Sequence, residues 1–223
     1  MERSNFIQAY NIDSGWREAL NLCVKNGYDY VVEGGSYVGQ IRKQLEHLTL
    51  VITDPGTRPL SPILPPSVPA PTTDEKIEKY FCGYILKSSL NYTEEYTYGQ
   101  YIMSQIDRVV DLLIESGGNT NQATLVIGDV KTTFSPDPPC LRSISFKVVN
   151  NKLNMTVYFR SWDIFAGLPE NLGGLQLLKE YVLNELPEGY EDGKIIAFSD
   201  GAHVYEQYFN LVNCLCAEKI VCS

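Results

Sequence analysis

Two runs of alternating apolar and polar residues, joined by an Asn-Asn pair, constrain the fold of this 223-residue chain most strongly. Every second residue of these runs is apolar: Ile144, Phe146 and Val148 in the first, and Leu153, Met155, Val157 and Phe159 in the second. The alternation is typical of half-buried strands, and Asn150-Asn151 suits a two-residue turn between them. We therefore predict an antiparallel hairpin in which paired residue numbers sum to 301, as 150 and 151 do.

This register places a cysteine beside an arginine at the open end of the hairpin. Cys140 would lie opposite Ser161 and next to Arg160, with neighbouring Cα atoms about 5 Å apart across the ladder. Because arginine keeps its charge, it favours a thiolate over a thiol at a neighbouring cysteine. Pro138 and Pro139 stiffen the approach to Cys140. The sequence thus predicts a thiolate beside an Arg-Ser pair that can bind an anion.

Cys140 also has a purely structural interpretation. Free cysteine is among the most buried residue types, and the chain has five other cysteines that need no chemistry. A lone cysteine is therefore weak evidence for a nucleophile, and spacing alone leaves both interpretations open.

Several further motifs follow the Pro-Cys pair in a fixed order. They are Arg160-Ser161-x-Asp163-x-Phe165-x-Gly167-Leu168-Pro169-x-Asn171 and, later, Asp200-Gly201-Ala202-His203-Val204-Tyr205. Together they resemble the thymidylate synthase family, especially its compact archaeal-type members, over about residues 98–205. The resemblance implies one α/β (α+β) domain over residues 1–223, a large twisted mixed β-sheet with helices on one face. It also implies a homodimer formed through the other face of the sheet.

The resemblance further implies a reaction. The chain would be a methyltransferase that converts dUMP to dTMP with 5,10-methylenetetrahydrofolate as co-substrate, through a covalent bond from Cys140 to C6 of the pyrimidine. Two alternatives stay open: a pyrimidine nucleotide 5-hydroxymethyltransferase and a noncatalytic nucleotide-binding homologue. Leu141, where the family has a histidine, is compatible with the first alternative. A scaffold would need neither Cys140 nor Arg160, which argues against the second.

The site residues follow from the same motifs. The resemblance implies catalytic roles for the nucleophile Cys140, for Arg160 and Asp163, and for Tyr98 in removing the C5 proton. It implies nucleotide contacts from Arg160, Ser161, Asn171, His203 and Tyr205, and folate contacts from Asp163 and Gly167. Asn171 would read the uracil edge, and the His203–Tyr205 pair would contact the sugar.

Each of these residues has a simpler interpretation as well. Asn171 is a favoured helix N-cap and Asp163 suits a turn. Tyr98 fits a packed edge. His203 and Tyr205 would share one face of a strand, where a buried structural histidine is common.

Phosphate recognition departs from the family pattern. Asn121 and Gln122 stand where the family carries arginines, and neutral amides form weaker bonds to phosphate than charged groups do. The family also has a glycine-rich loop that brings an arginine to the phosphate. Here Gly34, Gly35 and Ser36 precede Arg42, but a hairpin turn is the better explanation of the two glycines.

Composition and charge argue against three classes of partner: nucleic-acid polymers, membranes and metal ions. The formal net charge of −9 argues against binding to a nucleic-acid polymer, whose partners are usually basic. No apolar run approaches the roughly 18 residues of a membrane span, and no secretory signal opens the chain, so we expect a cytoplasmic protein without a membrane partner. Two histidines and no C-x-x-C pair give no support for a metal site.

Other segments complete the expected domain. Seven of the twelve prolines fall within 54–74, which predicts an extended surface loop. We expect helices over 14–26 with Ser14 as cap, over 75–86, from about Ile102 to before Gly117, from Asn171 to before Pro187, and from Glu206 onward. We expect strands over 28–33, 36–42, 48–53, 123–129 and 194–200.

Overall fold

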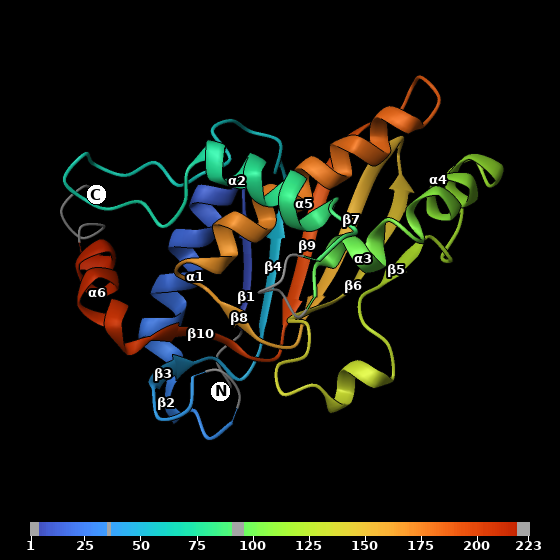
Figure 1. Cartoon of the computed structure of the whole chain (residues 1–223). Helices are drawn as coiled ribbons and strands as arrows, with labels where there is room; N and C mark the ends of the chain where they lie inside the picture. The colour runs from blue at the N-terminus through green and yellow to red at the C-terminus, as the bar shows by residue number, and fades with distance from the viewer. Residues whose placement is uncertain (1–4, 35–36, 91–95, 218–223) are drawn as a thin grey trace.

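The computed structural model describes residues 5–34, 37–90 and 96–217 of the chain. The larger of two mixed sheets consists of β1 (Phe6–Ala9), β4 (Leu48–Ile52), β5 (Thr124–Val126), β6 (Leu141–Val149), β7 (Lys152–Phe159) and β9 (Glu191–Ser199), in the order β1-β4-β9-β7-β6-β5. The smaller consists of β2 (Tyr28–Val31), β3 (Ile41–Gln44), β8 (Trp162–Asp163) and β10 (Ala202–Tyr205), in the order β2-β3-β10-β8. The helices described are α1 (Ile12–Asn26), α2 (Asp74–Tyr80), α3 (Tyr98–Ile102), α4 (Ile106–Glu115), α5 (Gly167–Glu185) and α6 (Phe209–Ala217) (Figure 1). This mixed architecture confirms the predicted fold class and adds a second sheet.

The central hairpin is confirmed, with one correction at its open end. Asn150 and Asn151 have φ values of 52° and 61°, the left-handed conformation that a tight hairpin turn requires. Pairs from Val149–Lys152 to Ser143–Tyr158 follow the predicted register, but an irregularity at Arg142 shifts it by one residue. Cys140 therefore faces Arg160, whose N–H donates to the Cys140 carbonyl at 2.9 Å, and not Ser161 as predicted.

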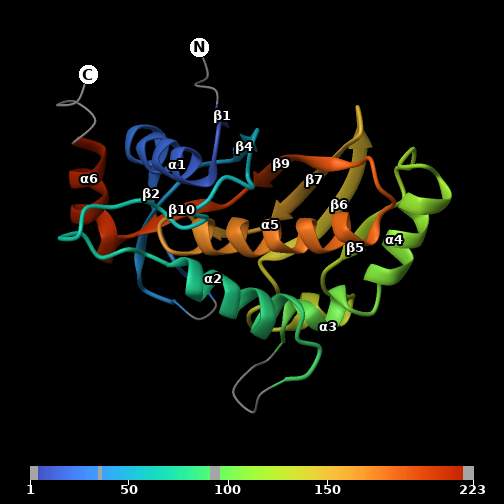
Figure 2. The same cartoon turned by 90° about the horizontal axis from the view of Figure 1, so that it is seen from above.

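The larger sheet has one buried and one open face. Alternate residues of β7, such as Met155 and Val157, are buried under α5, which lies along this face with α2 on its outer side (Figures 1 and 2). The opposite face carries partly exposed side chains, among them Phe6 on β1 and Phe198 on β9. Alternation along the strands thus separates the core from a face of the sheet that is accessible in this chain.

Helix α5 begins earlier than predicted. Asp163 accepts hydrogen bonds from the backbone N–H groups of Phe165 and Ala166 and closes a turn that leads into the helix at Gly167. Pro169 fits in the first helical turn, where a backbone donor is not required. Asn171 is therefore inside α5 rather than its N-cap, and its side chain is free to make tertiary contacts.

Two other helix boundaries also differ from the prediction. Asn11, not Ser14, is the N-cap of α1, and Ser14 is the third helical residue of a reciprocal capping box. The helix predicted from about Ile102 is interrupted: Ile102 ends a short helix, α3, that begins at Tyr98, and α4 begins only at Ile106, after a break at 103–105. The predicted buried face of α1, including Trp16 and Cys23, is confirmed.

Two adjacent glycines bring α2 close to α5. A Cβ atom on Gly173 would lie 2.8 Å from Ile77, and one on Gly174 would lie 2.7 Å from the ring of Tyr80. The chain continues from α2 through a π-helical turn, Phe81–Ile85, which adds Tyr84 to the same side. The glycines thereby allow two tyrosines to reach the region of Asn171 and Cys140.

Residues 54–73 contain neither helix nor strand and carry the proline-rich sequence. Leu60 and Thr72 are nevertheless buried, and the Asp74 carboxylate accepts the Ser61 N–H at 2.8 Å. The predicted glycine turn at 34–36 lies partly outside the described residues, because Gly35 and Ser36 are not among them. None of the described helices is long and apolar enough to cross a membrane.

Candidate active site

A pocket of about 860 Å³, open solvent at its mouth included, lies where the two sheets meet. Its lining combines residues at the ends of β6 and β7 with residues of the smaller sheet. Cys140, Arg160, Ser161 and Tyr205, four of the predicted site residues, all line it. Arg42 from β3 and Asp137 from the loop before Cys140 complete its ionisable lining, together with Tyr37.

The Arg160 side chain holds the segment that leads into Cys140. Its Nε donates to the carbonyl oxygens of Pro138 at 3.2 Å and Pro139 at 3.1 Å, and its Nη2 also contacts the Pro138 oxygen. The same Nη2 forms an ion pair with Asp137 Oδ1 at 3.1 Å. The two proline carbonyls thus orient the guanidinium by accepting from its Nε.

The acidity of Cys140 differs from the sequence-based expectation. Burial raises the pKa of the thiol, and this is the largest influence on it. Arg160 lowers the pKa, Asp137 raises it and Arg42 lowers it, in that order of size, and the net shift is upward. The predicted effect of Arg160 is present, but burial outweighs it because a charged sulfur is poorly solvated there.

Arg42 is the second cation of the pocket. It pairs with Tyr205 across β3 and β10, and its guanidinium carbon lies 4.6 Å from the centroid of the Tyr30 ring. Its Nε is buried and has no hydrogen-bond partner among the described residues. Arg42 is thus held by an aromatic ring while retaining unused donor capacity.

Four tyrosines, here called the tyrosine cluster, gather near Cys140: Tyr80, Tyr84, Tyr96 and Tyr98. The ring centroid of Tyr84 lies 5.6 Å from that of Tyr80 and 5.0 Å from that of Tyr98. Burial raises the pKa of all four phenols, that of Tyr96 to about 12, so they are neutral at physiological pH. The predicted residue Tyr98 accepts the backbone N–H of Leu141 at 3.3 Å, directly beside Cys140.

The side-chain amide of Asn171 is fixed by two neighbours. The Trp162 indole N–H donates to Asn171 Oδ1 at 3.1 Å, and Asn171 Nδ2 donates to the Tyr80 hydroxyl at 2.9 Å. An indole nitrogen can only donate, so it determines which end of the amide is the oxygen. Asn171 therefore presents its donor toward the tyrosine cluster.

Asp163 and Gly167 lie together at the start of α5. A Cβ atom on Gly167 would lie 3.5 Å from the Asp163 Cβ and 3.4 Å from Asn171 Oδ1. Burial raises the pKa of Asp163 to about 6, and the N–H groups of Ala166 and Phe165 oppose this increase. Both N–H groups bond the same oxygen, Oδ1. The turn-closing role expected as the simpler interpretation of Asp163 is therefore present.

His203 lies behind the pocket lining. Only 2% of the residue is exposed, and its Nδ1 lies 2.8 Å from the Gly201 carbonyl oxygen. A carbonyl only accepts, so Nδ1 carries the proton, while the buried Nε2 lacks a partner among the described residues. Burial lowers the pKa of His203 to about 4. Its ring meets that of Tyr205 edge-on at 4.8 Å, which confirms that the two residues share a face.

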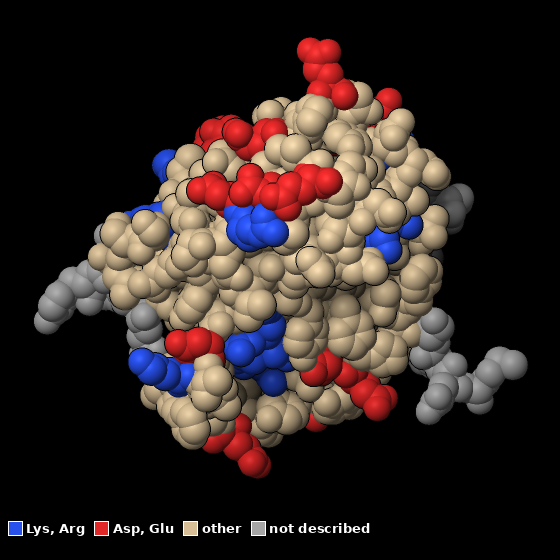
Figure 3. Space-filling model, turned by 90° about the vertical axis from the view of Figure 1, so that its right-hand side faces the viewer, with Lys and Arg blue, Asp and Glu red and all other residues tan. Residues whose placement is uncertain are grey.

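Asn121 and Gln122 do not line the pocket around Cys140. They border an open surface depression at the end of α4, and Asn121 Oδ1 accepts from the Lys147 ammonium at 3.0 Å. Figure 3 shows Asp and Glu side chains spread over the β5 and α4 side of the molecule, with a compact group of Lys and Arg side chains in its lower half. The acidic total therefore coexists with local positive charge.

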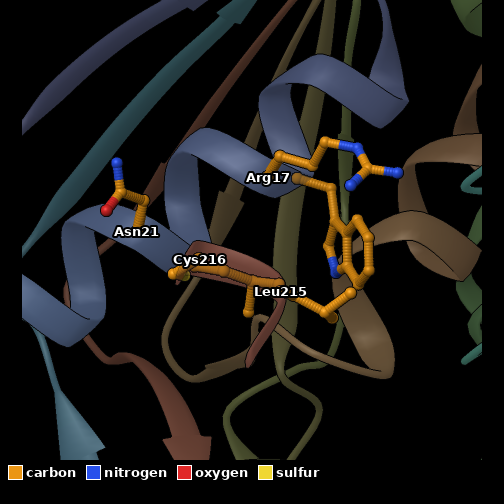
Figure 4. A pocket seen from close by; sticks show the side chains of 6 residues that line it. Arg17, Asn21, Leu215 and Cys216 are labelled. Carbon is orange, nitrogen blue, oxygen red and sulfur yellow. The ribbon is translucent and has the colours of Figure 1, made fainter. Parts of the chain in front are cut away.

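A smaller pocket between α1 and α6 contains none of the predicted site residues. Its lining includes Trp16, Arg17, Leu215 and Cys216 (Figure 4). Within the described part of the chain, no three His, Cys, Asp or Glu side chains are grouped so that they could hold a metal ion. The chemistry-bearing groups are concentrated around Cys140.

Sequence reasoning missed part of this site. Tyr80 and Tyr84 were not predicted, although their spacing of four places them on one side of a helix. Asp137 was also missed, although it lies in the loop that holds Cys140. Arg42 was noted only as the first arginine after a glycine turn, and its position depends on the pairing of β3 with β10.

Comparisons with known proteins agree with these motifs. A family model described as thymidylate synthase matches residues 90–220. Proteins named "Putative thymidylate synthase" from Methanosarcina mazei and Methanosarcina acetivorans are each 33% identical over 221 residues, covering 95% of this chain and 94% of the relative. One of the same name from Methanosarcina barkeri is 28% identical over 219 residues, with the same coverage. The chain belongs to the thymidylate synthase family.

Proposed function

We propose that this chain methylates dUMP to dTMP with 5,10-methylenetetrahydrofolate, using Cys140 as nucleophile. The observation that carries the proposal is the presence of a cysteine and two arginines in one pocket, with the base-reading candidate Asn171 held nearby. A nucleophile beside an anion site is the arrangement that a nucleotide-modifying enzyme requires.

Cys140 would attack C6 of the pyrimidine. The thiol must first lose its proton, and Arg160 and Arg42 are the two cations that stabilise the resulting thiolate. Addition of sulfur to C6 makes C5 electron-rich, and elimination of sulfur at the end restores the ring. The folate supplies the transferred carbon and the hydride. Formation of a covalent adduct divides one difficult step into two easier ones.

Arg160, Ser161 and Arg42 would hold the phosphate. An arginine can form two parallel hydrogen bonds to phosphate oxygens, and Arg42 lines the same pocket as Arg160. The neutral pair Asn121 and Gln122 lies outside the pocket, so Arg42 would provide charge that these positions lack. His203 and Tyr205 would define the sugar side, with the neutral imidazole orienting the Tyr205 ring.

Asn171 would read the uracil edge. The amide donates through Nδ2 and accepts through Oδ1, which complements the O4 acceptor and N3 donor of uracil but not cytosine. Tyr98, kept neutral by burial, would help to move the C5 proton through hydrogen bonds. Asp163 would accept from the pterin through Oδ2, with Gly167 leaving room beside it.

A second candidate is hydroxymethylation of the same nucleotide. Leu141 replaces a histidine of the family pattern and is fully buried, so it cannot order water next to Cys140. A different arrangement of water is the feature that would exchange hydride transfer for addition of water. The two reactions differ in both products, because addition of water gives a 5-hydroxymethyl nucleotide and releases tetrahydrofolate instead of dihydrofolate.

The protein would act as a homodimer through the open face of the larger sheet. Strand pairing places Phe6, Thr49 and Phe198 side by side on this face, and Phe198 stacks on Tyr158 at 5.8 Å. A two-fold axis would pack this surface against its own copy. Sedimentation equilibrium measures the assembly: a mass near twice 25.1 kDa supports the dimer, and a monomer contradicts it.

Incubation with dUMP and methylenetetrahydrofolate, followed by mass analysis of the nucleotide, tests the function. The account predicts dTMP and dihydrofolate. A 5-hydroxymethyl product would favour the second candidate. Binding of dUMP without turnover under these conditions would favour a noncatalytic homologue.

A further inference from the structure

A carboxylate, that of Asp137, lies beside the arginines proposed to bind phosphate. Asp137 lines the pocket together with Arg160 and Arg42, and its Oδ1 lies 3.1 Å from Arg160 Nη2. The side chains of Asp137 and Arg160 are 46% and 33% exposed, so a dissolved ligand can reach both partners. The Asp137 carboxylate thus binds Arg160 Nη2, a donor that a ligand in the pocket would also use.

The charges of the lining define what the pocket can bind. Two arginines and one carboxylate carry a combined charge of +1. A phosphate monoester carries about −1.5 to −2 near pH 7 and offers three acceptor oxygens. It matches two free arginines better than two arginines of which one is already paired.

We propose that Asp137 is a specificity-determining residue that competes with the phosphate of the substrate for Arg160. A phosphate entering the pocket displaces the Asp137 carboxylate from Nη2, and the carboxylate turns toward solvent. The inference rests on the proposed function for the identity of the nucleotide, but not for the competition itself.

Arg160 does not need Asp137 to keep its direction. Its Nε remains hydrogen-bonded to the carbonyls of Pro138 and Pro139. Loss of the carboxylate therefore releases a donor without releasing the guanidinium. The substitution Asp137→Asn keeps the shape of the side chain and removes its negative charge, and with it the ion pair to Arg160.

Asp137 also acts on the nucleophile. Its negative charge is one of the influences that raise the pKa of Cys140. The same substitution therefore has a second effect that requires no nucleotide, a lower pKa of the Cys140 thiol.

Calorimetric titration of wild type, D137N and the control D111N tests the competition. Asp111 is exposed on α4 and does not line the pocket, so D111N makes the same change of net charge elsewhere. D137N should bind inorganic phosphate and dUMP roughly tenfold more tightly, with binding of deoxyuridine unchanged. D111N should behave as wild type. The proposal is overturned if D137N binds phosphate and dUMP no more tightly than wild type does. The absence of measurable binding to both wild type and D137N also overturns it.

The pH dependence of Cys140 alkylation by iodoacetamide, followed on its own peptide by mass spectrometry, is the second readout. The midpoint should move to lower pH in D137N and remain in place in D111N, and an unmoved midpoint in D137N contradicts the proposal. If D137N shows both effects while no variant converts dUMP, the inference holds and the proposed function fails. If wild type produces dTMP but D137N shows neither effect, the function holds and the inference fails.

Discussion

The pocket lining and the tyrosine cluster surround Cys140 with opposite environments. Arg42, Asp137 and Arg160, here called the charged wall, are accessible from the pocket, and their two guanidinium groups favour the thiolate. The tyrosine cluster is neutral and largely removed from water, and burial favours the thiol. Burial is the larger influence, and the net shift of the Cys140 pKa is upward. The two environments act on the pKa of Cys140 in opposite directions, so its acidity depends on the balance between burial and the charges of the pocket.

Removing the main cation of the charged wall should have the largest effect. Arg160→Ala removes the proposed phosphate ligand, the cation that lowers the pKa of Cys140 and the hydrogen bonds to the Pro138-Pro139 segment. We expect kcat/KM for dUMP to fall by about 30-fold to about 4,000-fold, equivalent to roughly 2–5 kcal/mol for truncating a hydrogen-bonded charge.

Arg160→Lys is the control for charge alone. It should recover part of the phosphate affinity but little of the ordering of the loop, because lysine lacks the planar fork of arginine. Full activity in Arg160→Ala would show that the charged wall is not needed for the reaction.

The second prediction concerns His203, which lies behind the charged wall, and the pH dependence of the free energy of unfolding. The pKa of His203 is lowered from 6.5 to about 4, so the unfolded chain binds the proton more tightly. Stability contributed by neutral His203 is complete above about pH 6.5 and is lost as the pH falls toward about 4. The full loss is roughly 3 kcal/mol, from about 1.4 kcal/mol for each pKa unit.

Denaturant unfolding of wild type and His203→Asn from pH 7.5 to pH 4 measures this contribution. Asparagine can still donate to the Gly201 oxygen but does not titrate. Asp163, whose pKa of about 6 is raised, contributes the opposite slope below pH 6. Its contribution is common to both proteins, so the difference between them isolates His203. Parallel curves for the two proteins would contradict the buried neutral imidazole.

Within the tyrosine cluster, Tyr98→Phe should have a moderate effect. It leaves the buried Leu141 N–H without its acceptor, which costs about 1–3 kcal/mol. The melting temperature should fall by roughly 2–4 °C for each kcal/mol in a chain of this size. Turnover should also fall, whereas Tyr181→Phe on α5 should change turnover little. A Tyr98→Phe enzyme with normal stability would show that the hydrogen bond contributes nothing.

The smallest expected effect concerns base choice. Trp162→Phe retains an aromatic ring to stack on Phe159 but loses the N–H that fixes the Asn171 amide. The preference for dUMP over dCMP should decrease by about tenfold, the value of one hydrogen bond of about 1.4 kcal/mol. Trp16→Phe is the matched control, because its buried indole donates to Phe165 O instead. An equal change of preference in both variants would refute the positioning role of Trp162.

Sequence patterns were most informative for features formed by residues close together in the chain. The hairpin, its Asn-Asn turn and the nearness of Cys140 to Arg160 are consequences of alternation and chain order, and all three are present. The irregularity at Arg142 has no signal in the alternation, so the partner of Cys140 was predicted one residue away. The start of α5 was missed because Asp163 closes a turn before the helix.

Long-range contacts could not be predicted from spacing. The tyrosine cluster depends on Gly173 and Gly174, whose lack of side chains brings α2 onto α5. Arg42 reaches the pocket through its pairing with β10, and the raised pKa of Cys140 follows from burial that no motif reveals. The motifs identified the family, while packing determined the environment of Cys140.

Intact-protein mass spectrometry with 5-fluoro-dUMP, with and without methylenetetrahydrofolate, tests the central claim most directly. Wild type should gain the combined mass of nucleotide and folate, and Cys140→Ala should gain neither while remaining folded by circular dichroism. A covalent ternary adduct that depends on Cys140 would establish the nucleophile and both substrates together. No adduct on folded wild type, or an adduct that persists in Cys140→Ala, would contradict the account.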